Sequence, residues 1–321
     1  MNINESIVVV LTASAIFYGT PLIFAAVGEL LAERSGVLNL GVEGMMLMGA
    51  VSAFWAVQHL AGPDWLVLLL ATLIGGVVAL ATSLIHAVLS VGLRANQIVS
   101  GLAITIFAGV TGLSSYIGNV AHLGGQPALH EFTAVNVAGL SNAPVVGPIL
   151  FHQNALVYAS WAVVIVAWAY LYRTRTGLHL RAVGESPETA DVMGVNVVRY
   201  RYLHTLAGGL LAGVAGAYYS LVITPSWIDG MTSGVGWIAI ALVIFAFWRP
   251  ELTLVGAYLF GLFSSMGFVL QARGVRLPPE VLSSLPYVMT VVVLVVVSTG
   301  WAKQRLGAPA SLGTPYVREE R

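Results

Sequence analysis

Cysteine is absent from the 321-residue sequence, and charged side chains are few. The lack of cysteine excludes disulfides, thiolate metal sites and cysteine nucleophiles together. Charged residues make up 9% of the chain, whereas soluble globular proteins carry about a quarter. Lysine occurs once, at Lys303, and the formal net charge is zero. The basic face expected of a nucleic-acid-binding protein is therefore missing.

Several catalytic motifs are missing as well. The single lysine is followed by Gln304, so the chain has no G-x-x-x-x-G-K-[ST] phosphate-binding loop and should not hydrolyse ATP itself. It has no H-E-x-x-H helix and no G-x-S-x-G turn. His122, His130 and His152 share one segment, but their spacing fits no metal template. The sequence therefore predicts no enzyme, no metal site and no cofactor.

The chain has long apolar runs instead. Hydrophobic residues make up 58% of it, and the mean hydropathy is +0.87. A helix needs roughly 20 apolar residues to cross a bilayer. The candidate spans are 6–28, 37–60, 65–92, 95–117, 154–172, 198–224, 236–248, 251–270 and 283–300. Because one run is short and two are rich in glycine, we predict about eight to ten spans. The expected fold is an all-α integral membrane protein, a polytopic helical bundle forming one domain over 1–302.

The arginines indicate which side of the membrane each loop faces. They crowd residues 173–201, whereas the long segment 118–153 has neither Lys nor Arg. The positive-inside rule therefore places 173–201 and the C-terminal tail in the cytoplasm, and 118–153 outside. Arg273 and Arg276 fall on the outer side in this scheme and are its exception. The tail, 303–321, is polar and contains proline, a composition typical of a mobile segment.

One candidate span begins in an unusual way, with the stretch ERSGVLNLGVEGMM at 33–46. Asn39 can cap the helix that follows, which places Glu43 in or just after its first turn, where a carboxylate suits the helix dipole. Non-helical backbone at membrane depth survives only when it is buried in protein or lines a cavity. We therefore predict a broken helix near 35–44, packed inside the bundle rather than against lipid.

The loop at 174–202 contains the sequence GESPETADVMG. Ser186 is a good N-cap, Pro187 suits the first helical position, and Gly194 can supply the left-handed residue that ends a helix. These signals predict a short helix over 187–193. Isolated helices below about 12 residues are marginal in water, so the bundle or a partner must hold this one. The residues alone favour neither an anchored connector nor a docking element for a cytoplasmic partner.

Small residues gather along the candidate span 198–224. Gly209 and Gly213 form a G-x-x-x-G pattern, which lets helices approach closely. The pattern predicts tight helix packing rather than a ligand site.

Four stretches carry a family resemblance. They are GELLAERSGVLNLGVEGMMLMGA (28–50), NQIVSGLAITIFA (96–108), GLHLRAVGESPETADVMGVNV (177–197) and GVGWIAIALVIFAFWRPELTLVGAYLFGL (234–262). In this order they resemble the permease subunits of ATP-binding-cassette (ABC) importers for nucleosides, simple sugars and branched-chain amino acids. The AERSGVLNLGVEGMM wording is most similar to nucleoside-type permeases that work with a Bmp-like lipoprotein. Gln97 and Phe247 depart from the family pattern, which often has an acidic residue and a glycine there.

The resemblance implies a bacterial or archaeal cytoplasmic (inner) membrane and several partners. These are ABC ATPase subunits, a second homologous permease in a heterodimer or homodimer, and an extracytoplasmic substrate-binding lipoprotein facing 118–153. It also implies that 184–195 bears a coupling helix that contacts the ATPase. The residues assigned to that coupling are Gly184, Glu185, Pro187, Glu188 and Gly194. The candidate residues of the translocation path are Asn39, Glu43, Asn96, Gln97 and Thr105; packing hydrogen bonds are the alternative role for each.

Other functions remain open at this stage. The same machine could carry simple sugars of the ribose or galactose type, or branched-chain amino acids, in place of nucleosides. An ion-coupled secondary transporter would have ionisable residues embedded in several spans, whereas Glu43 is nearly alone. An intramembrane hydrolase would need a nucleophile and a base on facing helices, and the sequence offers no convincing pair.

Overall fold

The computed structural model describes residues 7–109, 112–137, 139–141, 143–272, 274, 278–297 and 307–317. Helices dominate these residues, and their one small sheet pairs β1 (Ala134–Asn136) with β2 (His152–Asn154) in antiparallel register. The prediction of an all-α polytopic membrane protein is confirmed.

Six helical runs among the described residues are long and apolar enough to cross a membrane. One of them, Gln97–Val120, is divided into two helices with a break between them, where the sequence predicted one span. The six runs comprise α1 (Ile7–Arg34), α3 (Asp64–Ala87) with the π-helical turn η1 (Val88–Gly92), α4 (Gln97–Ala108) with α5 (Leu113–Val120), α6 (Ala155–Arg173), α9 (Val197–Tyr218) with the π-helical turn η3 (Tyr219–Ile223), and α11 (Pro250–Ala272).

The other three candidate spans also contain helices. These are α2 (Val42–His59), α10 (Val235–Phe245) and α12 (Pro279–Val297). α10 has only 11 residues, fewer than a full crossing needs. Residues 298–300 of the last candidate span lie outside the described part of the chain. The remaining helical elements are η2 (Gly147–Phe151), α7 (Arg175–Glu185) and α8 (Pro187–Val192).

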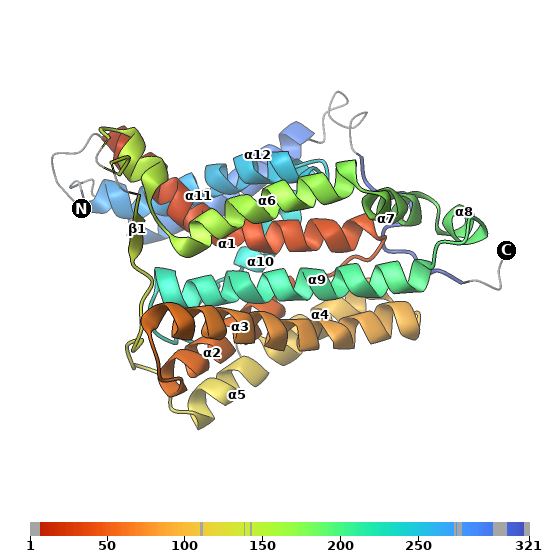
Figure 1. Cartoon of the computed structure of the whole chain (residues 1–321), viewed down its shortest axis with the longest axis horizontal. Helices are drawn as coiled ribbons and strands as arrows, with labels where there is room; N and C mark the ends of the chain where they lie inside the picture. The colour runs from red at the N-terminus through yellow and green to blue at the C-terminus, as the bar shows by residue number, and fades with distance from the viewer. Residues whose placement is uncertain are drawn as a thin grey trace.

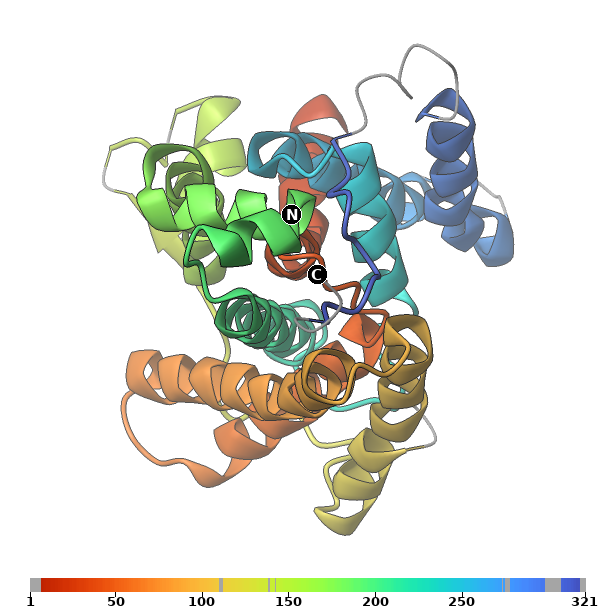
Figure 2. The same ribbon diagram turned by 90° about the vertical axis from the view of Figure 1, so that its right-hand side faces the viewer.

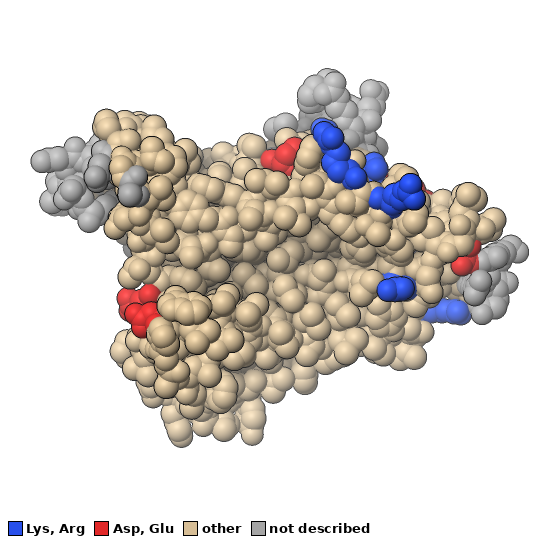
Figure 3. Space-filling view, in the orientation of Figure 1, with Lys and Arg blue, Asp and Glu red and all other residues tan. Residues whose placement is uncertain are grey.

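The long helices run roughly side by side, and α7 and α8 cap one end of the bundle (Figure 1). The arginines visible in Figure 3 gather at that same end, which we name the basic end. It carries every arginine that the structure describes, because each lies at or near the terminus of a helix that reaches this end. They are Arg34, Arg94, Arg173, Arg175, Arg181, Arg199, Arg201 and Arg249. Arg273 and Arg276 lie outside the described residues.

Seen from the basic end, α1 lies near the middle of the bundle (Figure 2). It packs against α6, α9, α10 and α11, while α2, α3 and α9 form a second closely packed group. In that group Gly49, Gly75 and Gly213 bring three backbones together: a Cβ on Gly75 would lie 2.8 Å from the carbonyl oxygen of Gly49, and a Cβ on Gly213 would overlap the carbonyl of Gly75. The prediction of tight packing along Gly209 and Gly213 is confirmed.

Candidate functional site

The chain leaves the helical path between α1 and α2. After Arg34, Gly36 adopts a left-handed backbone (φ +88°), which glycine reaches without steric cost. Residues 35–41 are non-helical, and most of them are buried. The predicted broken helix near 35–44 is therefore present, with its break confined to 35–41 because Val42 already begins α2.

Side chains from neighbouring helices bond the backbone of this break. Water cannot do so inside a membrane, so such bonds are what allow non-helical chain at that depth. The acceptors and donors come from α1, α3 and α4. The bonds join Leu38 N–H to Gln97 Oε1 (2.7 Å), Asn39 N–H to Glu29 Oε1 (3.0 Å), Thr105 Oγ1 to the Leu40 carbonyl (2.8 Å) and His86 Nε2 to the Leu38 carbonyl (3.2 Å).

Asn39 does not cap α2, contrary to the prediction. The N-cap residue is Gly41, which makes no side-chain capping bond. Asn39 Oδ1 instead accepts the N–H of Gly41 at 2.9 Å, a turn that asparagine commonly forms two residues ahead of itself. Because this bond lies within the break, the Asn39 side chain does not accept the first N–H groups of α2.

Glu43 lies in the first turn of α2, as predicted, and its side chain is 7% exposed. Its carboxylate reaches a second helix start, that of α10. It accepts hydrogen bonds from Thr232 Oγ1 (2.6 Å) and from the N–H groups of Gly234 (2.8 Å) and Gly236 (2.7 Å). A Cβ on Gly236 would lie 2.6 Å from the Glu43 Cα, so the close approach needs glycine there. The Glu43 carboxylate therefore lies at the N-terminal ends of both α2 and α10, where the helix dipole favours a negative charge.

The five candidate path residues all have structural partners. Asn96 Oδ1 caps α4 by accepting the N–H of Val99 at 3.1 Å. Gln97 and Thr105 bond the backbone of the break to α4, Asn39 bonds Gly41 within the break, and Glu43 joins the first turn of α2 to the start of α10. These contacts give each residue a packing role. Their contact with a substrate stays a prediction.

Two more buried carboxylates accompany Glu43, so the expectation that it is nearly alone is wrong. Glu29 and Glu33 on α1 are each 1% exposed. Glu29 holds the break through Asn39, and Glu33 accepts a hydrogen bond from the indole N–H of Trp248. Arg34 donates to the carbonyl of the same Trp248 at 2.8 Å. The end of α1 is therefore fastened to the turn between α10 and α11.

At the basic end, α8 matches the predicted short helix closely. Ser186 caps it by accepting the N–H of Thr189, Pro187 is its first residue, and Gly194 is left-handed (φ +83°) just beyond its end. Of the residues assigned to coupling, Gly184 and Pro187 are buried, whereas Glu185, Glu188 and Gly194 are exposed. The sequence did not predict α7, which precedes α8 and is capped by Thr174. Thr174 is a favoured N-cap residue, and it is the feature of the sequence from which α7 could have been predicted.

The described part of the tail, 307–317, lies against this pair of helices. Ser311 N–H donates to the carbonyl of Gly184 at 2.9 Å, and Gly313 N–H donates to that of Gly36 at 3.2 Å. The guanidinium of Arg201, 1% exposed, donates to the carbonyl of Thr314 at 2.9 Å. The polar, proline-containing composition suggested mobility, yet these contacts anchor this part of the tail.

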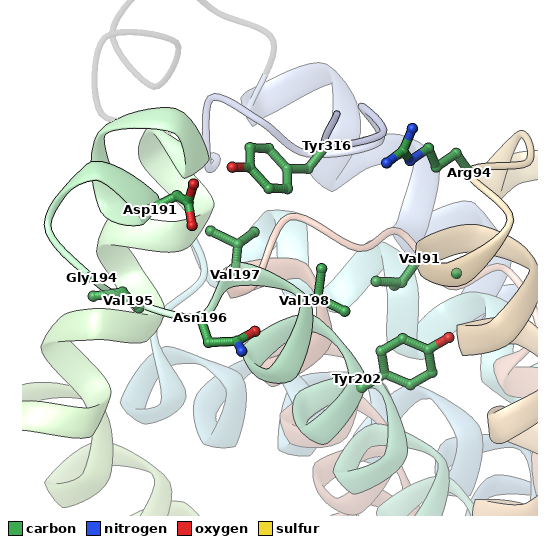
Figure 4. A pocket seen from close by; sticks show the side chains of 11 residues that line it. Val91, Arg94, Asp191, Gly194, Val195, Asn196, Val197, Val198, Tyr202 and Tyr316 are labelled. Atoms are coloured by element: carbon green, nitrogen blue, oxygen red, sulfur yellow. The ribbon is translucent and has the colours of Figure 1, made fainter. Parts of the chain in front are cut away.

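A pocket of about 530 Å³ opens between the α8–α9 turn, the end of η1 and the tail. Tyr316 from the tail and Tyr202 from α9 contribute aromatic rings, and Asn196 lines the turn (Figure 4). Asp191 and Arg94 lie on opposite sides of the Tyr316 ring in this view. The tail therefore forms one wall of a cleft whose other walls belong to the α8–α9 turn, the start of α9 and the end of η1.

Several known proteins similar to the chain are named as transport permeases. The family described as "Branched-chain amino acid transport system / permease component" matches residues 11–296. The nucleoside ABC transporter permease protein NupC of Lactococcus lactis is 39% identical, over 92% of this chain and 93% of NupC. The guanosine ABC transporter permease protein NupQ of Bacillus subtilis is 33% identical, over 100% of both chains.

An archaeal protein gives a comparable match. TsgC13 of Haloferax volcanii, provisionally named a glucose ABC transporter permease protein, is 40% identical over 94% of this chain and 95% of its own length. No solved structure shows significant similarity to the chain. All three relatives are named as ABC transporter permeases, but their names give different substrates.

Proposed function

The chain belongs to the branched-chain amino acid transport system / permease component family, and we propose that it is the permease subunit of an ABC importer for nucleosides. In this role the bundle forms part of the substrate path, and separate subunits hydrolyse ATP. The names of NupC and NupQ support the nucleoside substrate. The name of TsgC13 supports a simple sugar as the second candidate.

The observation that carries the proposal is the exposed apolar surface of the coupling segment. Val192 and Met193, at the end of α8, are 69% and 78% exposed, and Leu178 on α7 is 56% exposed. Met and other apolar side chains at the centre of such a patch are typical of a protein interface. Gly184 and Glu185 end α7, Pro187 and Glu188 begin α8, and Gly194 follows it. Because the exposed apolar side chains lie on these same two helices, we assign this surface to contact with the ATPase.

The charge distribution supports an orientation for the chain. The basic end, with 173–201 and the tail, faces the cytoplasm under the positive-inside rule. The sheet of β1 and β2, at the end of the segment 118–153, then faces outward, where a substrate-binding lipoprotein would dock. The single chain leaves many apolar side chains of α4, α11 and α12 exposed. Lipid and a second permease, identical or homologous, are the surroundings that we assign to them.

Uptake measurements test the substrate. A strain lacking this gene should lose uptake of radiolabelled guanosine or adenosine and keep uptake of ribose and glucose, and the gene on a plasmid should restore the loss. Loss of glucose or ribose uptake with intact nucleoside uptake would reassign the substrate to sugars. The same strain with leucine as the labelled compound tests the amino acid alternative.

Replacing Met193 by Asp tests the coupling surface. The side chain is exposed, so the free energy of unfolding should change by no more than about 0.5 kcal/mol. Loss of an interface anchor costs about 2 kcal/mol, so the affinity for the ATPase subunit should fall about 30-fold. Co-purification of the ATPase with the tagged permease measures this, with Met193→Leu as the matched control. Equal recovery with both variants would rule out docking at α8.

A further inference from the structure

A second pocket lies beside the contact between Glu43 and the start of α10. Its volume is about 430 Å³, and α1, η3, the start of α10, α11 and α12 line it. Thr232, which donates to Glu43, also lines this pocket. Tyr287 of α12 closes another side by donating its hydroxyl to the carbonyl of Ser233 at 2.7 Å. The pocket is therefore built on the same backbone segment that the Glu43 carboxylate holds.

Four of the thirteen lining residues that the structure describes carry aromatic rings. Tyr18 on α1 and Phe268 on α11 stack, with centroids 5.9 Å apart and an angle of 15° between the rings. Tyr219 and Tyr287 complete the set. Phe268 and Tyr287 both line the pocket, so a ligand inside it can contact their rings. Parallel aromatic faces are the surfaces on which nucleobases stack, whatever the base.

Hydroxyl groups lie next to these rings. Tyr18, Tyr219, Thr224 and Ser264 line the pocket, and their hydroxyls bond to no described residue. A polar group in an apolar setting gains most from a partner that supplies the missing hydrogen bond. A ribose presents hydroxyls that can donate and accept, and a base edge presents further acceptors and donors. Flat rings beside unbonded hydroxyls match both halves of a nucleoside.

No charged side chain belongs to the described lining of this pocket. A branched-chain amino acid carries an ammonium and a carboxylate, and burying both away from water without charged partners is costly. The lining therefore favours a neutral ligand over an amino acid. The stacked ring pair favours a nucleoside over a free sugar.

We propose that this pocket is a nucleoside subsite of the translocation path, in which the base stacks on Phe268 and the Tyr219 hydroxyl bonds the ligand. The inference rests on the proposed function and names where the chain itself touches the substrate. The proposal also gives α12 a part in substrate contact. Tyr287 of α12 bonds the carbonyl of Ser233, next to Gly234, whose N–H donates to Glu43.

Photo-crosslinking with 8-azidoadenosine tests the site directly. In membrane vesicles that contain the complete transporter, light should attach the label to peptides that include Tyr18, Tyr219, Phe268 or Tyr287. Excess guanosine should suppress the labelling, and excess glucose should not. Label confined to other peptides, while the vesicles still take up nucleosides, would overturn the proposal. Suppression by glucose as strong as that by guanosine would assign the pocket to sugars and overturn it too.

Uptake by matched variants gives a second readout. Phe268→Ala should lower the rate of adenosine uptake roughly tenfold, the scale expected for loss of one stacking partner. Phe268→Tyr, which keeps the ring, should restore most of it. Tyr219→Phe should lower the rate severalfold because it removes only the hydroxyl.

The controls are exposed residues outside the pocket. Phe107→Ala and Tyr116→Phe remove the same groups from side chains that are 54% and 64% exposed. Recovery of the ATPase complex shows that each variant folds. Equal uptake by the pocket variants and these controls would overturn the subsite. If the wild-type transporter takes up no nucleoside, the proposed nucleoside substrate is wrong, and the proposed subsite is ruled out with it.

Discussion

The central break and the basic end satisfy their polar groups in different ways. In the break, side chains of α1, α3 and α4 bond the backbone of 38–40, and the Glu43 carboxylate binds the start of α10. At the basic end, backbone groups, the Ser311 hydroxyl and the guanidiniums of Arg34 and Arg201 hold the tail, while Val192 and Met193 remain exposed. The polar groups of the break are therefore bonded within one chain, whereas the basic end exposes apolar side chains that we propose contact another subunit. Substitutions in the break should disturb folding, and those at the basic end should disturb coupling.

Glu43→Ala should have the largest effect. It leaves the N–H groups of Gly234 and Gly236 without their acceptor, at about 2 kcal/mol each and about 4 kcal/mol together. Thermal unfolding of the purified protein should show a much lower Tm, and uptake should be lost. Glu43→Gln should lie between this variant and the wild type, because an amide oxygen still accepts.

Glu131→Gln is the control for Glu43, since Glu131 is an exposed carboxylate at the opposite end of the bundle. Wild-type Tm for Glu43→Ala with uptake lost would show that the residue serves transport alone. Such a result would mean that the break, like the basic end, affects function without affecting folding.

Arg201→Gln should have the next largest effect, and it should be local. The buried guanidinium bonds Thr314 and Ser311 of the tail, and each bond to a charged group contributes about 1.5–3 kcal/mol. We expect the tail to become sensitive to protease while the bundle keeps its Tm within a few degrees. Limited proteolysis measures this, and Arg199→Gln, at an exposed arginine two residues earlier, is the control. A protected tail in Arg201→Gln would show that the remaining contacts, from the backbone, Ser311 and Arg34, suffice.

Gly236→Ala should destabilise the chain by about 1–3 kcal/mol, because the new Cβ would meet the Glu43 backbone. Gly124→Ala is the matched control, since nothing lies within 4 Å of a Cβ there. The difference in Tm between the two variants measures the cost of the close approach. Equal Tm values would mean that α2 and α10 can separate without loss.

Ser186→Ala should have the smallest effect. Loss of an N-cap costs about 1 kcal/mol, and α8 has only six residues to lose. We expect an unchanged Tm, faster hydrogen exchange in 187–193, and ATP-driven uptake reduced severalfold. Ser186→Asp, which can still cap, should behave as the wild type. Slower exchange in the Ala variant than in the Asp variant would contradict the role of the cap.

Local signals explain which features the sequence could predict. Ser186, Pro187 and Gly194 place α8 because caps act within a few residues of the helix they end. The glycines and polar groups of 35–44 likewise indicated a break. The role of Asn39 was predicted wrongly. An asparagine side chain can accept the backbone N–H two residues later as readily as it caps a helix.

The missed features depend on contacts distant in sequence. Glu29 lies inside a long apolar run, and its partner, Asn39, becomes apparent only when the break folds back on α1. The tail docks through Arg201 and through carbonyl groups of Gly184 and Gly36, which no sequence pattern reports. The prediction of Glu43 in a first turn was local and correct, whereas its bonds to Gly234 and Gly236 required the fold.

The glycine contact of α2, α3 and α9 decides where this chain can change shape. Backbone touches backbone at Gly49, Gly75 and Gly213, so only one register fits. A slide of one turn, about 5.4 Å, would drive side chains into the space that the glycines leave. These three helices therefore move as one block. Any motion that opens one face of the membrane therefore has to occur at contacts outside this block. One such contact is the hydrogen bonding of the Glu43 carboxylate to the start of the short helix α10.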